Sequence, residues 1–567
     1  MKIRPFAFGL MVVAGLTVAP VPVTAQGIAG AFLAAREAGI RNDFAHATPY
    51  LERLLHDDPE NAATLEGAAV SAFSAGDFAT ATRHATTLAA LDPANRASTL
   101  ILLTDAFAQQ DYARALDLAS SEAEVHPLIV GLAQAWAELG QGRMSEALAF
   151  LDQSAAQEGM TAFAQYCRAL ALSLVGDVEG ALAVMEDVNG GVTSTLNRRG
   201  YVAYAQLLGL SERFDDALAL MEAVFTGAND PRIFAMDEAY RAQTALPFDL
   251  ITTPAQGMAE VFAVMANAMR SVQNLHEALI YAQAAVAINP SLTDAQLMIG
   301  QIFEDLEQPA LAIEAYGRIP EGDVFHMAAG MGQAQVMQTL GQMDEAIQSL
   351  TALSEQNPRS FVARQVLGDF LRQDGQYAAA IEAYTSAIAM MTERGITPGW
   401  QTWFSRAVAY ERSDQWPEAE ADFRAALAIE PNQSTTLNYL GYSLVERGES
   451  YDEALEMIER AVEIEPSSGY IVDSLAWALF KLGRYDEAVP HMERAVELAP
   501  ADAILNDHLG DVYWAVGRQR EARFQWRRAL SFGPSDDLDS ELVRRKLEIG
   551  LDAVRAEDGQ EPLHPVN

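Results

Sequence analysis

The chain has 567 residues, 50% of them apolar, and its 78 acidic residues against 38 basic ones give a formal net charge of −40. Such a charge repels nucleic acid and anionic lipid at long range, so it disfavours both as partners and favours basic polypeptides or cations. Acidic helix faces also keep a long chain soluble without any ligand, and the composition leaves both interpretations open.

Residues 1–25 have the pattern of an export signal. Lys2 and Arg4 precede the apolar run Phe6–Val18, and a Val-Thr-Ala triplet ending at Ala25 offers small residues for cleavage. The sequence therefore predicts a signal peptide, a mature chain that begins near Gln26, and a periplasmic location. No cysteine stands directly after the leader, and no later segment is long and apolar enough to span a bilayer. We therefore expect no lipid or transmembrane anchor, while peripheral association with the envelope stays open.

From residue 26 to 230 the chain repeats a helix–turn–helix pattern about every 34 residues. Small and large apolar residues recur in register, with an alanine at the position where two helices would cross. These alanines are Ala47, Ala81, Ala115, Ala147, Ala181 and Ala217. The pattern predicts an N-terminal solenoid of degenerate repeats, because no single unit of this kind can bury its apolar stripe alone.

Residues 231–258 interrupt this rhythm. Three prolines, Pro231, Pro247 and Pro254, flank a helix-compatible segment that fits no repeat. We predict an inserted helix with loops on both sides, and a boundary here between the N-terminal solenoid and a second one over residues 259–536.

The clearest repeats lie in the second solenoid, where Pro466, Pro500 and Pro534 close successive 34-residue units. In one unit Val472 and Leu479 belong to a stripe at helical spacing, which predicts a first helix with one apolar face. After the last unit we expect a capping helix over residues 537–552 and a disordered tail over residues 553–567.

This spacing is that of the tetratricopeptide repeat (TPR), two antiparallel helices per unit. The predicted fold is all-α, a right-handed superhelical TPR solenoid of about fourteen helix–turn–helix repeats with a C-terminal capping helix. The segments NYLGYSLVERG, GYIVDSLAWALFKLGRYDEAVPHMERAVEL and NDHLGDVYWAVGRQREARFQWRRAL resemble exported TPR proteins of the alphaproteobacterial cell envelope. The resemblance implies a non-enzymatic envelope protein linked with envelope integrity.

The search for catalytic chemistry finds no constellation. The chain contains no histidine pair with metal-site spacing, no phosphate loop and no nucleophile elbow. His508 between Asp507 and Asp511 is the best acid–base candidate, yet neighbouring positions on a helix point in different directions. Cys167, the only cysteine, lies in an apolar helical run and is expected to be buried. We predict no enzyme, no metal and no cofactor.

Positions that face the inside of a TPR superhelix carry aromatic, asparagine and aspartate side chains in the last three repeats. Such side chains can bond a peptide backbone and pair with a cation, although the aromatic ones could instead pack between adjacent helices. The predicted partner-binding groove comprises Asn438, Tyr442, Tyr470, Asp473, Trp477, Asp507, Asp511 and Trp514.

A cluster of basic residues stands out against the acidic background near the C-terminus. It comprises Arg523, Arg527, Arg528, Arg544 and Arg545. It could contact anionic lipid or an acidic partner, or it could only balance the neighbouring glutamates.

The sequence thus predicts a periplasmic scaffold or adaptor that binds polypeptide partners in its concave groove and supports assembly or integrity of the envelope. Partners with basic segments are among those expected. The alternative is a chaperone for secretion or outer-membrane assembly that carries unfolded clients. Nucleic acid is not an expected partner.

Overall fold

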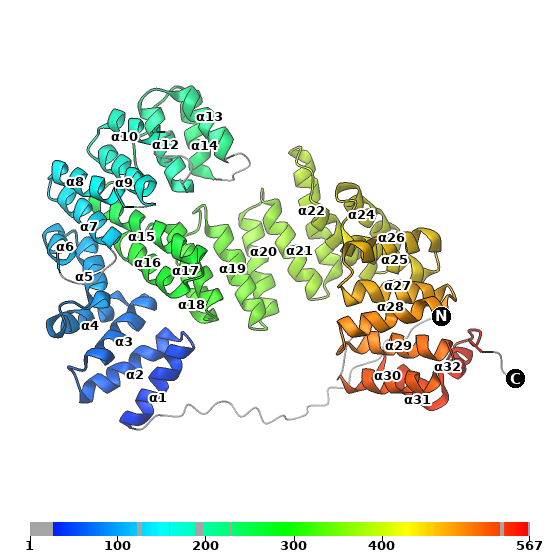
Figure 1. Cartoon of the computed structure of the whole chain (residues 1–567). Coiled ribbons are helices and arrows are strands. Elements are labelled where there is room, and N and C mark those ends of the chain that lie inside the picture. The colour runs from blue at the N-terminus through cyan, green and yellow to red at the C-terminus, as the bar shows by residue number, and fades with distance from the viewer. Residues whose placement is uncertain are drawn as a thin grey trace. The chain divides into compact units, whose positions relative to one another are not determined.

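The computed structural model describes residues 27–121, 127–157, 159–187, 197–225, 230–532 and 538–564. Over these ranges the chain forms helices and no strand (Figure 1). Within the described residues, six helix pairs precede the single helix α14, and eight pairs and then the cap helices α31 and α32 follow it, which confirms the prediction of about fourteen repeats and a cap. The predicted signal peptide lies outside the described residues.

The chain divides into two compact units, Met1–Gln342 and Met343–Asn567. The helices of the first unit are α1 Ile28–Ile40, α2 Phe44–Asp57, α3 Ala62–Ser74, α4 Phe78–Leu91, α5 Arg96–Ala108, α6 Tyr112–Ala119, α7 Pro127–Gly140, α8 Met144–Ala155, α9 Thr161–Leu174, α10 Val178–Met185, α12 Arg198–Leu210, α13 Phe214–Phe225, α14 Pro231–Arg241, α15 Pro254–Ser271, α16 Leu275–Ile288, α17 Thr293–Asp305, α18 Pro309–Gly317 and α19 His326–Thr339.

The helices of the second unit are α20 Met343–Gln356, α21 Phe361–Gln373, α22 Tyr377–Glu393, α23 Trp400–Arg412, α24 Trp416–Ile429, α25 Ser434–Arg447, α26 Tyr451–Ile464, α27 Gly469–Lys481, α28 Tyr485–Leu498, α29 Ala503–Ala515, α30 Gln519–Ser531, α31 Ser540–Ile549 and α32 Leu551–Glu557. No helix within the described residues is long and apolar enough to cross a membrane.

Helices α15 and α16 pack against the first helices of the N-terminal repeats, and this contact explains why the first unit extends to residue 342. Helix α15 contacts α5, α7 and α9, and α16 contacts α3 and α5 (Figure 1). Trp136 of α7 is buried against Gly257 of α15, and the Gln283 side-chain amide donates to the Ser74 carbonyl at 2.9 Å. The division thus falls after α19, not in the segment 231–258 where the sequence analysis placed a boundary.

Within this unit, the absence of a side chain at Gly257 permits the close approach of α15. A Cβ atom built there would lie 2.3 Å from the Trp136 ring. We therefore expect Gly257→Ala to reduce the free energy of unfolding of the first unit by about 1–3 kcal/mol, because a buried indole has to move. Urea unfolding of the full chain measures the loss. Gly39→Ala, where a Cβ meets nothing within 4 Å, is the matched control and should be neutral or stabilising. Equal behaviour of the two variants would contradict the packing described here.

A recurring contact fixes the crossing of the two helices within a repeat. In the second unit Tyr384 of α22 lies over Gly368 of α21, and its hydroxyl donates to Asp369 at 2.6 Å. Trp526 of α30 makes the equivalent bond to Asp511 of α29, with Nε1 donating at 2.9 Å. A buried aromatic donor is thereby satisfied by the carboxylate beside the crossing.

The C-terminal cap is longer than the sequence predicted. A single helix over residues 537–552 and a disordered tail from residue 553 were expected, whereas α31 ends at Ile549, Gly550 follows with a φ of +82°, and α32 begins at Leu551. The backbone N–H groups of Leu563 and His564 then donate to Asp552 at 2.6 and 3.2 Å. Residues 553–557 therefore belong to α32, residues 558–564 fold back onto it, and residues 565–567 lie outside the described part.

Candidate functional site

The eight predicted groove residues lie on α25, α27 and α29, the first helices of three successive repeats. Helix α27 packs against both α25 and α29, so equivalent positions on the three helices are neighbours. A capping side chain fixes the start of α29, the last of these helices. Asp502 caps α29 by accepting the N–H groups of Ile504 and Leu505 at 2.9 and 3.0 Å.

Trp477 is the centre of the first of two clusters on this surface. Its ring stacks on His508 with centroids 3.9 Å apart and planes 13° apart, and on Phe480 at 4.9 Å. Its Nε1 donates to Glu446 at 2.5 Å, while His508 Nδ1 lies 3.0 Å from a carboxylate oxygen of Asp473. This aromatic cluster of Trp477, Phe480 and His508 thus presents flat rings with two carboxylates at their edges.

The pKa of His508 is set by two opposing effects. Burial alone would lower it, but the Asp473 carboxylate, with smaller contributions from Asp507 and Asp511, raises it above its ordinary value. The proton on His508 is therefore stabilised by folding.

This shift predicts how stability depends on pH. Because the pKa of His508 is raised, its contribution is fully present below about 6.5, the ordinary value, and is lost as pH rises through the folded-state value. Asp511, whose pKa is raised to about 6 by burial against the opposing effect of Lys546, acts in the same direction at lower pH, and its contribution is lost by about pH 6. We expect the protection factors of the α27 and α29 amides, which correct for the intrinsic exchange rate at each pH, to fall between pH 6 and pH 9. His508→Gln should flatten this dependence, and an unchanged slope in that variant would contradict it.

Lys546 of the cap forms the second cluster with two of the predicted groove residues. Its side chain is 4% exposed, and its Nζ lies 2.8 Å from Asp507 and 2.7 Å from Asp511. Asp511 also accepts the Trp526 N–H described above. Lys546 therefore balances one of the two aspartate charges and holds both carboxylates within the chain.

Trp514 is likewise covered by the cap. It is 5% exposed, its Nε1 donates to Asp552 of α32 at 3.0 Å, and its ring touches Gly550. Of the predicted groove residues, Asp507, Asp511 and Trp514 are therefore buried beneath the cap. The sequence analysis treated the capping helix as an end of the solenoid, whereas it folds over the last repeat.

The remaining predicted residues differ in their exposure. Tyr470 is 62% exposed at the start of α27, apart from the aromatic cluster. Tyr442 is partly buried beside Glu446 and Asp473, and burial followed by these charges raises its pKa. Asn438 is partly buried, and its Oδ1 has no hydrogen-bond partner among the described residues. Binding of a partner by these residues stays a prediction.

A cleft of about 500 Å³ separates the aromatic cluster from the cap. Trp477, Lys481 and His508 line one side, and Leu542, Val554 and Arg555 line the other. Its lining thus combines aromatic and aliphatic side chains with charged groups, among them Asp507, Asp511 and Lys546, and such a mixed lining suits a short length of polypeptide.

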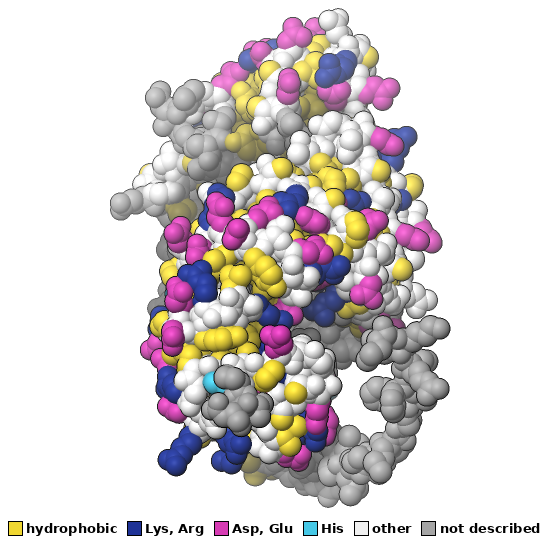
Figure 2. Space-filling model, turned by 90° about the vertical axis from the view of Figure 1, so that its right-hand side faces the viewer, with side chains coloured by type: hydrophobic (Ala, Val, Ile, Leu, Met, Phe, Trp, Pro, Cys, Tyr) yellow, Lys and Arg dark blue, Asp and Glu magenta, His cyan; other side chains and the backbone are white. Residues whose placement is uncertain are grey.

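Most arginines of the basic cluster form ion pairs, hydrogen bonds or ring contacts with other residues of the chain. Arg544 pairs with Glu541 at 3.2 Å, Arg545 pairs with Glu557 at 2.7 Å, and Arg528 donates to the Pro500 carbonyl at 3.0 Å. Arg523 lies over the Trp514 ring at 5.7 Å. On the face shown in Figure 2, acidic and basic side chains are interspersed. These contacts favour charge balance within the chain over a lipid-binding patch.

The sequence analysis missed the partners that organise the site: Glu446, His508 as a stacking residue, and Lys546. A signal for them existed, because His508 lies 35 residues after Asp473, and Lys546 lies 35 residues after Asp511. A separation of about one repeat places two side chains at the same level of adjacent units. Considering His508 only with its neighbours on one helix concealed this.

The thiol of Cys167 and possible clusters of metal ligands complete the search for reactive groups in the described part of the chain. Cys167 is buried, as predicted, and burial raises the pKa of its thiol. Within the described residues, no group of three or more His, Cys, Asp or Glu side chains could hold a metal ion.

Comparison with known families supports the repeat assignment. A model described as tetratricopeptide repeat matches residues 331–399, 438–503 and 474–537, and a second model with the same description matches residues 400–433. The chain therefore carries tetratricopeptide repeats in its C-terminal part, and its all-helical architecture is that of a TPR solenoid.

Individual relatives match only parts of the chain. The TPR repeat-containing protein PA4667 of Pseudomonas aeruginosa is 28% identical over 191 residues, which are 34% of this chain and 31% of that protein. Bacteriophage adsorption protein A of Escherichia coli is 33% identical over 103 residues, 18% of this chain and 10% of its own length. The chain thus spans under a third of either relative. Among solved structures, the APC/C hetero-tetramer Cut9-Hcn1 aligns with 93% of this chain and 97% of its own, at 14% identity and a TM-score of 0.39.

Proposed function

We propose that the chain is a non-enzymatic, protein-binding scaffold that holds a polypeptide partner in the cleft between α27, α29 and the cap, beside the aromatic cluster. TPR solenoids bind polypeptides along the surface formed by their stacked repeats. The observation that carries the proposal is the cleft beside Trp477 and His508, whose aromatic rings border a space of about 500 Å³ instead of being covered by another helix.

The first unit supports the proposal by contrast. There α15 and α16 of the same chain cover the first helices of the early repeats. A helix of this chain thus occupies the surface that a partner would use, and it shows what kind of segment such a surface accepts. In the second unit the cap covers only the last repeat, through Lys546 and Trp514.

The chemistry of the cleft favours a segment with apolar and basic side chains. Trp477 offers contact area, the buried Phe480 supports its ring, and Glu446 lies at the edge of that ring. The Lys481 ammonium already lies 5.4 Å from that ring, which shows that the ring face can receive a cation. The net charge of −40 would speed association with a basic segment.

The location that we propose is the periplasm, and the role is support of envelope assembly or integrity. The export pattern of residues 1–25 and the resemblance of the last repeats to exported envelope proteins support this proposal. Mass spectrometry of the mature protein should find Gln26 at its start, and recovery of a chain that retains Lys2 would refute export by this route.

An affinity pull-down from envelope extracts tests the function. A scaffold should recover a few polypeptides in fixed proportion, whereas a chaperone for unfolded clients should recover many. For the variant Trp477→Ala, which removes the aromatic ring beside the cleft, the matched control is Phe524→Ala. This control removes a 61% exposed aromatic side chain from α30, the second helix of its repeat. Loss of the same partners in this variant would place the binding surface elsewhere.

A further inference from the structure

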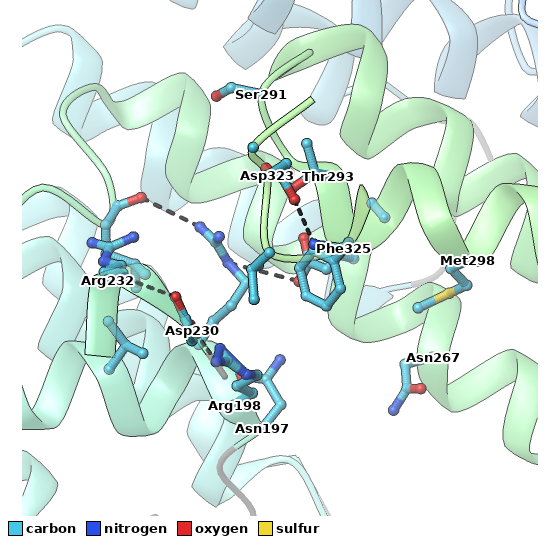
Figure 3. Close-up of a pocket in the computed structure, with 18 residues that line it drawn as sticks. Asn197, Arg198, Asp230, Arg232, Asn267, Ser291, Thr293, Met298, Asp323 and Phe325 are labelled. Atoms are coloured by element: carbon cyan, nitrogen blue, oxygen red, sulfur yellow. Dashed lines mark hydrogen bonds and ion pairs between the residues drawn. The ribbon is translucent and has the colours of Figure 1, made fainter. Parts of the chain in front are cut away.

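A cavity of about 540 Å³ lies inside the first unit, where four helices begin (Figure 3). Arg198 and Arg199 come from the start of α12, Arg232 from α14 and Asp294 from α17. Phe325 stands immediately before α19. Segments far apart in the sequence therefore contribute one lining, independently of the cleft in the second unit.

Three arginines, each paired with a carboxylate, contribute to the lining of this cavity. Arg199 donates through Nε to the buried Glu260 at 2.8 Å, Arg198 pairs with Asp230, and Arg232 pairs with Asp249. These pairs hold the guanidinium groups in position. A guanidinium carries five N–H donors and each pair uses only some of them, so the three arginines keep donors for an anion.

A carboxylate oxygen in the lining lacks a donor. Asp294 Oδ1 is buried and has no hydrogen-bond partner among the described residues, and the nearest cation, Arg199 Nε, is 3.9 Å from the other oxygen. Glu260, 1% exposed, also has an oxygen without a partner, and it lies on the face of α15 that carries Ala263 and Asn267 of the lining. Buried oxygens without a partner are rare and favour a missing donor such as an ammonium group.

The rest of the cavity suits an apolar side chain. Val202, Leu250, Met298 and Phe325 all contribute to its lining. In Figure 3, Arg198 and Arg232 lie on one side, and Asp323, Thr293 and Phe325 lie across the cavity from them. The Thr293 hydroxyl donates to Asp323 at 3.0 Å, which holds this opposite wall in shape.

We propose that this cavity binds a short peptide with free termini. The carboxylate of the peptide pairs with the arginines, its ammonium group donates to Asp294, and an apolar side chain packs against Phe325 and Met298. The combination, in one cavity, of guanidinium donors and a carboxylate oxygen without a donor is the feature that selects a zwitterion over a simple anion or a cation. The volume lies in the range of sites that enclose small ligands.

Isothermal titration calorimetry of the full chain tests this with one probe, an alanine–phenylalanine–alanine tripeptide with free ends. Its N-acetylated and C-amidated forms should each bind at least about tenfold more weakly, because each removes one of the two charges. Binding of the amidated form alone would show a cation site, and binding of the acetylated form alone would show an anion site. Either result, or no binding of the free tripeptide, would overturn the proposal.

Variants locate the probe. Asp294→Asn and Arg232→Gln should each weaken binding of the free tripeptide by at least about tenfold. Their controls are Asp305→Asn at the far end of α17 and Arg241→Gln at the far end of α14, both outside the lining, and both should bind as the wild type does. Equal affinity in the cavity variants and their controls would also overturn the proposal. The blocked peptides test it on the wild type, whatever the stability of a variant.

Discussion

Replacing Lys546 by methionine should destabilise the last repeat and its cap by about 3–5 kcal/mol. The ammonium group is buried between Asp507 and Asp511 at 2.8 and 2.7 Å, so its removal leaves two carboxylates without a countercharge. Native-state hydrogen exchange of the full chain measures the effect as a lower free energy of opening for α29 to α31, since repeats open locally.

Two comparisons isolate the charge effect. Lys481→Met removes a partly exposed ammonium group that pairs with Glu446 at 3.2 Å, and should change the opening free energy by no more than about 1 kcal/mol. Adding Asp507→Asn and Asp511→Asn to Lys546→Met should restore most of the loss, because no charge is then left unpaired. Failure of the triple variant to recover would show that Lys546 stabilises the cap by packing instead.

Trp477→Ala should weaken binding of the partner recovered by the wild type by about 2 kcal/mol or more, roughly 30-fold, as expected for an aromatic residue at the centre of an interface. The ring borders the cleft, stacks on His508 and Phe480, and lies at the edge of the large core of the second unit without belonging to it. Calorimetric titration with the purified partner gives the affinity.

Trp514→Ala is the matched comparison, because it removes the same side chain from the next repeat. Trp514 is covered by the cap, so this variant should lower the stability of α29 to α32 as a core variant does. Melting temperature and circular dichroism separate the two effects. If Trp477→Ala lost stability as Trp514→Ala does and kept the partner at full affinity, the aromatic cluster would be packing and not a binding surface.

The repeat architecture could be predicted because each unit repeats the same local pattern. Alanine at the helix crossing and a closing proline define a unit within 34 residues, and adjacent units supply most of the buried contacts. The prediction failed where contacts link distant parts of the chain. Nothing in the local pattern indicates that α15 packs against α7, since that contact depends on Gly257 meeting Trp136 across the superhelix.

The candidate site could be predicted only in its helix positions. Trp477 and Asp473 do share the neighbour His508, yet Asp507 and Asp511 pair with Lys546, a residue of the capping helix beyond the repeats. The position of the cap depends on how α31 and α32 fold back over α29, with Trp514 bonded to Asp552. Such long-range pairing follows from the folded geometry and not from the spacing within a repeat.

Site-specific photo-crosslinking tests most directly the claim that this face of the second unit binds a polypeptide. A benzophenone amino acid replaces Tyr470, which is 62% exposed at the start of α27, or in a second preparation Phe524, which is 61% exposed on α30. With an envelope extract, the probe at residue 470 should yield a discrete adduct of defined mass, and Trp477→Ala should abolish it. Adducts of equal yield from both positions, or none from residue 470, would contradict the proposed binding surface.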